Sequence, residues 1–203
     1  MQRIIFATGN QGKMREIRKI LEGLRINGEE VEILSMKEAG IEIDIVEDGS
    51  TFAENAIIKA KAVAEAAKNA IVLADDSGLE VDYLNKEPGI YSARYMGEET
   101  PYSQKNANII SRLAGVEDEK STARFVCAIA AALPGGSVMT ELATIEGRID
   151  YEEKGSNGFG YDPIFYVPAY GKTTAELTEE EKNEISHRGK ALRAIRKRLE
   201  EKV

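Results

Sequence analysis

Two periodicities of apolar residues divide the chain into strands and helices. Short apolar runs at residues 3–7 and 71–74 predict buried strands, whereas the apolar residues of 14–24 recur at helical spacing. Long apolar stretches at 122–133 and 138–149 flank a Pro-Gly-Gly-Ser turn, which predicts an antiparallel hairpin. Helices and strands interleave from end to end, so we expect an α/β fold with a mixed sheet and flanking helices.

Capping and turn residues predict the remaining boundaries. Thr51-Phe-Ala-Glu54 matches a capping box and begins an alanine-rich helix that we expect to end near Lys68. The strand at 71–74 is expected to end where Asp75-Asp76-Ser77-Gly78 begins, with extended structure resuming at Leu79. Further expected elements are a strand at 31–34, a helix at 103–113, a short strand at 164–167, and helices at 178–185 and 188–201.

The composition is typical of a folded chain and argues against some classes of partner. Hydrophobic residues make up 42% and charged residues 31%, as in globular proteins. There are 27 Lys and Arg against 35 Asp and Glu, a net charge of −8, which argues against nucleic acid or an anionic membrane as partner. Cys127 is the only cysteine, which excludes an internal disulfide and fits a reducing cytoplasm. No apolar run is long enough for a membrane span, so we expect a cytoplasmic protein with one domain over residues 1–203.

The first candidate site is the glycine turn after the first strand. Such a turn lets backbone N–H groups approach an anion at a helix N-terminus, and Lys13 adds a full positive charge. The spacing is neither that of a Walker A loop nor that of a dinucleotide-binding loop. An ordinary tight strand-to-helix connection is the alternative. The residues of the turn are Thr8, Gly9, Asn10, Gln11, Gly12 and Lys13.

Two adjacent carboxylates, Asp75 and Asp76, form the second candidate. Open α/β sheets bind ligands at the carboxyl ends of their strands, and burying two carboxylates in a core is costly. Carboxylate oxygens suit Mg²⁺, which takes one or two protein carboxylates and completes its shell with water and substrate phosphates. The alternative is a solvated turn capped by Asp and Ser.

Two segments of the second half complete the candidates. The glycine-rich loop at 155–162 carries aromatic rings that can stack on a base, and Asp162 can accept from the N–H groups of that base. Lys182 and Ser186-His187-Arg188 come just before the last helix, and His187 is the only histidine. A solvated surface histidine beside basic neighbours is the alternative for His187.

Together these segments resemble the inosine triphosphate pyrophosphatase family, also called the XTP/dITP diphosphatases. Separated blocks occur in the family's order and span nearly the whole chain. They are residues 6–10 with Lys13 and Glu16, then 51–56, 75–79, 88–94, 158–165, 175–177 and 186–189.

The resemblance implies hydrolysis of ITP, dITP and XTP to the nucleoside monophosphate and pyrophosphate, in a central cleft between two lobes of each subunit of a homodimer. It implies Mg²⁺ as cofactor and Asp76 as both general base and metal ligand. Glu47 is implied as the second metal carboxylate, with Asp48 and Glu54 as alternatives. The implied substrate contacts are Thr8, Gly9, Asn10, Gln11, Gly12, Lys13, Ser77, Phe159, Gly160, Tyr161, Asp162, Lys182, His187 and Arg188.

Residue chemistry agrees with a 6-oxo purine as substrate. His187 and Arg188 can both donate to O6, whereas the 6-amino group of adenine would present a donor to donors. A nucleotide-binding module without turnover is one alternative, but a binder of a polyanion gains little from Asp75 and Asp76 unless a metal intervenes. A pyrophosphatase for modified pyrimidine nucleotides is another, and the segment 186–188 disfavours it.

Overall fold

A computed structural model describes residues 2–67 and 69–202 and has a mixed α/β architecture, as the hydrophobic pattern predicts. Hydrogen-bonded neighbours in the sheet follow the order β2-β3-β1-β4-β5-β6-β7-β8. Strand β1 is parallel to β3 and β4, whereas β7 is antiparallel to β6 and β8, so the sheet is mixed. The strands are β1 (Gln2–Phe6), β2 (Arg25–Ile26), β3 (Glu29–Ser35), β4 (Ile71–Val81), β5 (Thr122–Ala132), β6 (Val138–Ile149), β7 (Phe165–Val167) and β8 (Lys172–Thr173). The helices are α1 (Gln11–Ile20), α2 (Phe52–Ala66), α3 (Tyr102–Arg112), α4 (Glu179–Ile185) and α5 (His187–Lys202).

The chain forms two compact units. Strands β4, β5 and β6 contribute residues to both of them. Unit 1 comprises Met1–Asp76, Cys127–Ala143 and Arg188–Val203, and unit 2 comprises Ser77–Val126 and Thr144–His187.

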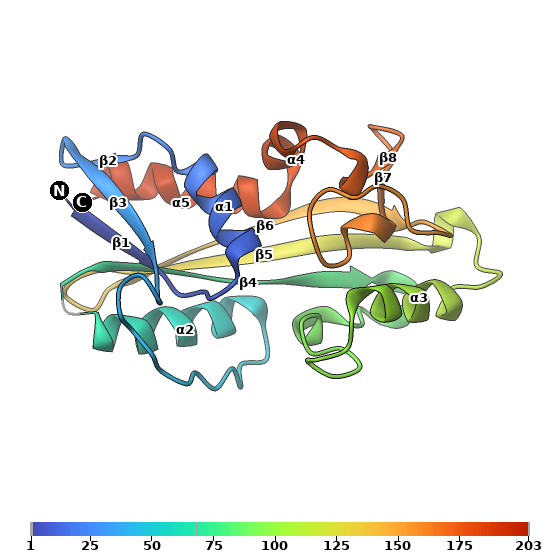
Figure 1. Cartoon of the computed structure of the whole chain (residues 1–203), viewed down its shortest axis with the longest axis horizontal. Coiled ribbons are helices and arrows are strands. Elements are labelled where there is room, and N and C mark those ends of the chain that lie inside the picture. The colour runs from blue at the N-terminus through green and yellow to red at the C-terminus, as the bar shows by residue number, and fades with distance from the viewer. Residues whose placement is uncertain (1, 68, 203) are drawn as a thin grey trace. The chain divides into compact units, whose positions relative to one another are not determined.

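Helices cover both faces of the strands of unit 1. Figure 1 shows α1 and α5 on one side of these strands and α2 on the other. On the first side, Met14 and Ile17 of α1 pack with Phe6 of β1 and Leu192 of α5 in one buried cluster. On the other side, Ala56 and Ala60 of α2 are fully buried. Because helices cover both faces of these strands, side chains on both faces are buried, which explains the continuous apolar runs in the sequence.

The core of unit 2 is more aromatic. Phe125 of β5 and Phe165 of β7 lie with ring centroids 4.2 Å apart, and Ile109 of α3 belongs to the same buried cluster. The Tyr161 hydroxyl donates to the Ser92 backbone oxygen at 2.7 Å, which ties the glycine-rich loop to the segment before α3. These contacts hold the loop at 155–162 against the unit 2 core.

The long hairpin is confirmed. Strands β5 and β6 are neighbours in the sheet. Leu133 N–H donates to Ser137 O at 2.9 Å next to the turn, and Ile149 N–H donates to Ser121 O at 3.0 Å at the other end. Hydrogen bonds at both ends of two consecutive strands are those of an antiparallel pair.

One predicted boundary, the end of the strand at 71–74, needs correction. Strand β4 does not end at Asp75 but continues through Asp75, Asp76 and Gly78 to Val81. A strand tolerates this polar run because consecutive side chains point to opposite faces, where each carboxylate finds polar partners on the covering helices. Helix α2 begins as predicted after Thr51, whose side chain accepts from Glu54 N–H, and it ends at Ala66. The expected end near Lys68 lies outside the described residues.

Candidate active site

The turn between β1 and α1 presents backbone N–H groups at a helix N-terminus. Asn10 caps α1, because its side chain accepts from the Lys13 N–H at 3.0 Å, and its own N–H donates to Thr8 Oγ1 at 3.2 Å. The first turn of α1 contains no acidic residue that would offset its partial positive charge. A Cβ at Gly9 would meet no described atom within 4 Å, so contacts within the described chain do not require a glycine there. The turn therefore has open space next to its backbone donors.

Asp75 faces the side of the sheet covered by α1 and α5. Lys13 Nζ lies 3.1 Å from Asp75 Oδ1 and 2.9 Å from Oδ2, and Arg188 Nη2 lies 3.4 Å from Oδ2. Arg188 also donates through Nη1 to Glu16 at 2.6 Å. Burial by itself raises the pKa of Asp75, but the cations of Lys13 and Arg188 outweigh it and hold that pKa below its usual range. The carboxylates of Asp75 and Glu16 and the cations of Lys13 and Arg188, together called the Asp75 cluster, carry no net charge.

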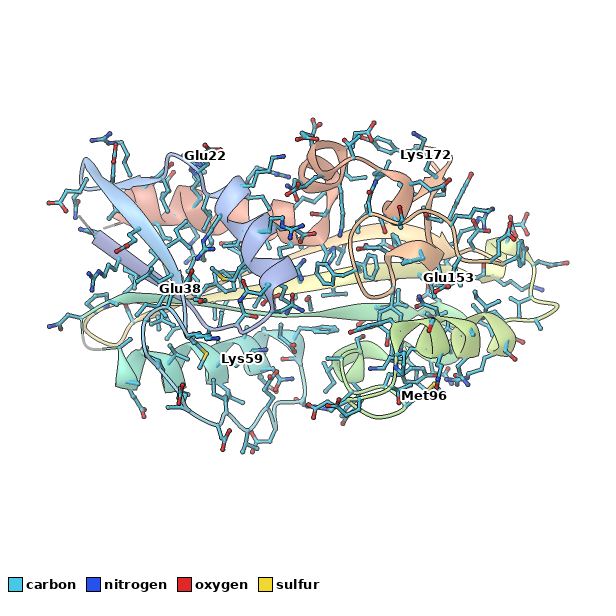
Figure 2. The ribbon with its side chains drawn as sticks, viewed as in Figure 1. Glu22, Glu38, Lys59, Met96, Glu153 and Lys172 are labelled. Carbon is cyan, nitrogen blue, oxygen red and sulfur yellow. The ribbon has the colours of Figure 1, made fainter. Side chains whose placement is uncertain are left out.

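Asp76 faces the other side, toward α2. Its Oδ2 accepts from Asn55 Nδ2 at 3.1 Å, and its Oδ1 lies 3.6 Å from the ammonium of Lys59, which is labelled on α2 in Figure 2. Asn55 Oδ1 in turn accepts from Gly49 N–H at 2.9 Å, which holds the acidic segment against the helix. Burial raises the pKa of Asp76 above its ordinary value, and the opposing effects of Lys59 and Asn55 do not cancel this rise.

Glu47 and Asp76 converge on one cation position. Lys59 Nζ lies 2.8 Å from Glu47 Oε2 as well as 3.6 Å from Asp76 Oδ1, so both carboxylates reach the same point. Two carboxylates and one ammonium leave a net charge of −1, in contrast to the neutral Asp75 cluster. Glu54, an alternative to Glu47, instead accepts from Ser50 N–H and Oγ at 2.7 and 2.6 Å.

This pair fits a magnesium ion. Mg²⁺ uses one or two protein carboxylates and fills its octahedron with water and phosphate oxygens. Within residues 2–67 and 69–202, no three His, Cys, Asp or Glu side chains are grouped so that they could hold a metal ion. Glu47 and Asp76 are the two carboxylates of this site that could hold a divalent cation.

In unit 2, Asp162 organises the glycine-rich loop. Its Oδ2 accepts from Phe159 N–H at 2.8 Å and from Lys182 Nζ at 2.7 Å, and its Oδ1 accepts from Thr174 Oγ1 at 2.8 Å. Lys182 Nζ also lies 5.0 Å from the centre of the Phe159 ring, within cation–π range. In the structure, the oxygens of Asp162, a predicted contact of the base, accept from these groups of the protein.

His187 and Arg188 are neighbours in sequence with different surroundings. The His187 ring stacks on Phe125 with centroids 4.9 Å apart and 23° between the planes, and only 6% of the residue is exposed. It is therefore not the solvated histidine of the alternative interpretation. Arg188 is 3% exposed and binds Glu16 and Asp75. Ser77 follows Asp76 in β4 and is half-buried.

Comparison with known proteins identifies the family. The model of the Ham1 family matches residues 4–198. The chain belongs to the Ham1 family. A dITP/XTP pyrophosphatase of Bacillus subtilis (strain 168) is 48% identical over 200 residues, with 98% of each chain covered, and one of Clostridium perfringens is 45% identical over 204 residues with the same coverage. The Ham1 protein of Staphylococcus aureus has a solved structure with a TM-score of 0.86 and 40% identity, with 100% of both chains covered. These findings confirm the resemblance read from the sequence.

In this member of the Ham1 family the structure groups the predicted residues into three clusters. In the first cluster, Lys13 and Arg188 both contact Asp75. In the second, Glu47 and Asp76 both contact Lys59. In the third, Phe159 and Lys182 both donate to Asp162. Sequence reasoning did not recognise Asn55 and Glu16 as members of these clusters. Both lie inside the blocks that carry the family resemblance, which is the signal that could have found them.

Proposed function

We propose that this Ham1-family protein is an enzyme that hydrolyses non-canonical purine nucleoside triphosphates, namely ITP, dITP and XTP, to the nucleoside monophosphate and pyrophosphate. Such an activity removes deaminated purines from the nucleotide pool. Relatives 45 to 48% identical carry the name dITP/XTP pyrophosphatase, which supports the proposal. The observation that carries it is the convergence of Asp76 and Glu47 on one cation position, next to an Asp75 that binds Lys13.

Asp76 is the proposed general base. Asn55 holds one of its oxygens in place, which orients the carboxylate for proton transfer. Asp76 accepts a proton from the water that attacks the α-phosphorus, and pyrophosphate leaves in line with the attack. The backbone donors of residues 8–12 and the Lys13 ammonium stabilise the charge on the phosphate oxygens.

Glu47 and Asp76 are the proposed ligands of a divalent cation, with Mg²⁺ as the expected ion. A bound Mg²⁺ would neutralise charge on the phosphates and polarise the scissile bond. Lys59 now neutralises part of the charge of these carboxylates, and it can turn to a phosphate oxygen when a cation takes its place.

We propose that residues of the second half of the chain recognise the base. His187 and Arg188 donate to O6, and the 6-amino group of adenine is rejected because it offers a donor to donors. Phe159 supplies a ring for stacking, and Asp162 and Lys182, which bind each other and hold the loop, are further proposed contacts of the substrate. Ser77, Gly160 and Tyr161 complete the proposed substrate contacts, and residues 1–203 act as one catalytic domain.

The expected assembly and compartment follow from the same family assignment. We propose a homodimer that works in the cytoplasm and binds no nucleic acid. Burial raises the pKa of Cys127, the only cysteine of the sequence, to about 12 and keeps it a thiol. Across the described residues, none of the helices combines the length and the apolar character needed to cross a membrane.

The decisive experiment incubates the protein with ITP, dITP, XTP, GTP and ATP and measures pyrophosphate and orthophosphate separately. We expect pyrophosphate from the first three, with much lower rates on ATP. Release of orthophosphate, or equal rates on ATP and ITP, would contradict the proposal. Binding of ITP with no product would instead indicate a nucleotide-binding module.

Two substitutions test the roles of the carboxylates. Asp76→Asn should nearly abolish turnover and leave the far-ultraviolet circular dichroism spectrum unchanged. Glu47→Gln should raise the Mg²⁺ concentration needed for half-maximal rate, whereas Asp48→Asn, a neighbouring control on an exposed residue, should not. Near-normal turnover of Asp76→Asn would remove Asp76 as the base.

A further inference from the structure

Asp75 and Asp76 are adjacent in β4 and serve opposite faces of the sheet of unit 1. Asp75 binds Lys13 of α1 and Arg188 of α5, whereas Asp76 binds Asn55 and lies near Lys59 on α2. Figure 1 shows α1 and α5 on one side of these strands and α2 on the other. The two carboxylates therefore cannot have the same role.

We propose that Asp75 is a positioning residue: it holds the Lys13 ammonium at the phosphate-binding turn and is not a ligand of the metal. This inference rests on the proposed function of that turn, and it assigns a role to a residue outside the proposed catalytic and binding set. Asp75 touches neither the reacting atoms nor the substrate and acts through Lys13.

The geometry of the pair supports this role. Lys13 Nζ lies within 3.1 Å of both Asp75 oxygens, so both oxygens of the carboxylate contact the ammonium. Lys13 keeps 20% of its side chain exposed, while that of Asp75 is 1% exposed. The ammonium thus lies at the edge of the buried cluster, where one of its three donors can still reach a ligand.

Contacts with α1 and α5 hold Asp75 and Lys13 in place. Arg188 Nη2 lies 3.4 Å from Asp75, and Arg188 Nη1 donates to Glu16, which lies three residues after Lys13 on α1. Asp75 is therefore fixed from α5 while α1, which carries Lys13, is fixed to the same arginine. A lysine side chain has four flexible bonds, and ordering it before the ligand arrives lowers the cost of binding.

The Asp76 side of the strand contrasts with this arrangement. The charges of Asp75, Glu16, Lys13 and Arg188 cancel, whereas Glu47, Asp76 and Lys59 carry a net charge of −1. A divalent cation is attracted to the second group rather than to the first. Binding a metal at Asp75 would displace two cationic side chains, Lys13 and Arg188, whereas binding one between Glu47 and Asp76 would displace only Lys59.

Steady-state kinetics of Asp75→Asn test the proposal, with ITP as substrate at saturating Mg²⁺. Asparagine keeps the shape of the side chain and removes its charge. We expect KM to rise about tenfold or more, because a hydrogen bond to a charged group is lost, while kcat changes less than about threefold. The Mg²⁺ concentration for half-maximal rate should stay at the unsubstituted value.

A double substitution separates positioning from a structural role. If Asp75 acts through Lys13, the KM of Lys13→Met/Asp75→Asn should equal that of Lys13→Met alone, because the first change removes the group that the second would misplace. Effects that multiply would overturn the proposal. A loss of Mg²⁺ activation in Asp75→Asn equal to that of Glu47→Gln would also overturn it, since Asp75 would then be a metal ligand.

A measurement on the unsubstituted protein covers the case in which Asp75→Asn does not fold. Limited acetylation, followed by peptide mass spectrometry, should modify Lys13 more slowly than Lys61, an exposed lysine of α2. Equal rates would overturn the proposal, because the Lys13 side chain would then be as accessible as an exposed lysine and not held against the buried Asp75 carboxylate.

Failure of the proposed function has a separate signature, namely no pyrophosphate from the unsubstituted protein. In that case the same set of variants is compared by calorimetric titration with inorganic tripolyphosphate. We expect Asp75→Asn to raise Kd and the double variant to match Lys13→Met. Unchanged Kd in Asp75→Asn would overturn the positioning role.

Discussion

The buried ion pair between Asp162 and Lys182 offers a quantitative test of how the glycine-rich loop at 155–162 is held. The carboxylate and ammonium lie 2.7 Å apart, and their side chains are only 5% and 7% exposed. Asp162→Asn removes the charge and places an N–H₂ group or a neutral oxygen against Lys182 and Phe159 N–H. Removing one partner of a buried pair costs about 3–5 kcal/mol, because the other charge stays in a medium of low polarity. For a chain of this size each kcal/mol lowers Tm by about 2–4 °C, so Tm should fall by about 6–20 °C.

The assay is thermal unfolding followed by calorimetry, with an exposed pair as control. Glu117 lies 3.1 Å from Lys120 in unit 2, with side chains 69% and 65% exposed, and such surface pairs contribute less than about 1 kcal/mol. Glu117→Gln should therefore lower Tm by no more than about 4 °C. Asp162→Asn/Lys182→Met should be more stable than the sum of its single changes, since it leaves no buried ammonium. A fall in Tm for Asp162→Asn no larger than that of the control would refute this account of the loop.

Two further predictions concern pH and backbone conformation. Hydrogen bonds from the Ser35 N–H and hydroxyl hold the pKa of Glu38, labelled in Figure 2, at about 2. Because this folded-state pKa lies below the ordinary 4.5, the stabilisation is complete above pH 4.5 and disappears as pH falls toward 2, so the Tm difference between Glu38→Gln and the parent should shrink over that range. Gly158 has φ +73°, and a Cβ there would collide with Asp162, so Gly158→Ala should cost about 1–3 kcal/mol and raise KM for ITP. Gly136→Ala is the matched control, with φ +89° and nothing within 4 Å among the described atoms, and equal KM values for the two variants would contradict the collision.

Much of the local structure could be predicted from the sequence, because apolar periodicity and caps act over a few residues. The strand β1, the helix α1 and the hairpin of β5 and β6 lie close to their predicted positions. The end of β4 was predicted wrongly because four consecutive polar or glycine positions are typical of a turn. The covering helices supply polar partners for both carboxylates, and a local pattern contains no information about them.

The candidate site, too, could be predicted from the sequence only in part. The ordered blocks identify the family and the residue types, and the comparisons confirm the family. The contacts of each residue could not be predicted from the sequence, because they join distant positions. Arg188 binds a glutamate 172 positions away, and Lys13 binds an aspartate 62 positions away. Asp162 illustrates the consequence: its type predicts a contact with a base, and only the structure shows that it also holds its own loop.

By itself, then, the sequence determined the class of fold, the family and the set of polar residues available for chemistry. Only the tertiary structure decided that Asp75 and Asp76 have opposite surroundings, one neutralised by Lys13 and Arg188 and the other beside Glu47. The physical reason is that the alternation of a strand sends adjacent side chains to different faces. Which charges meet them there depends on helices that are far away in the sequence, and those charges set each pKa and each role.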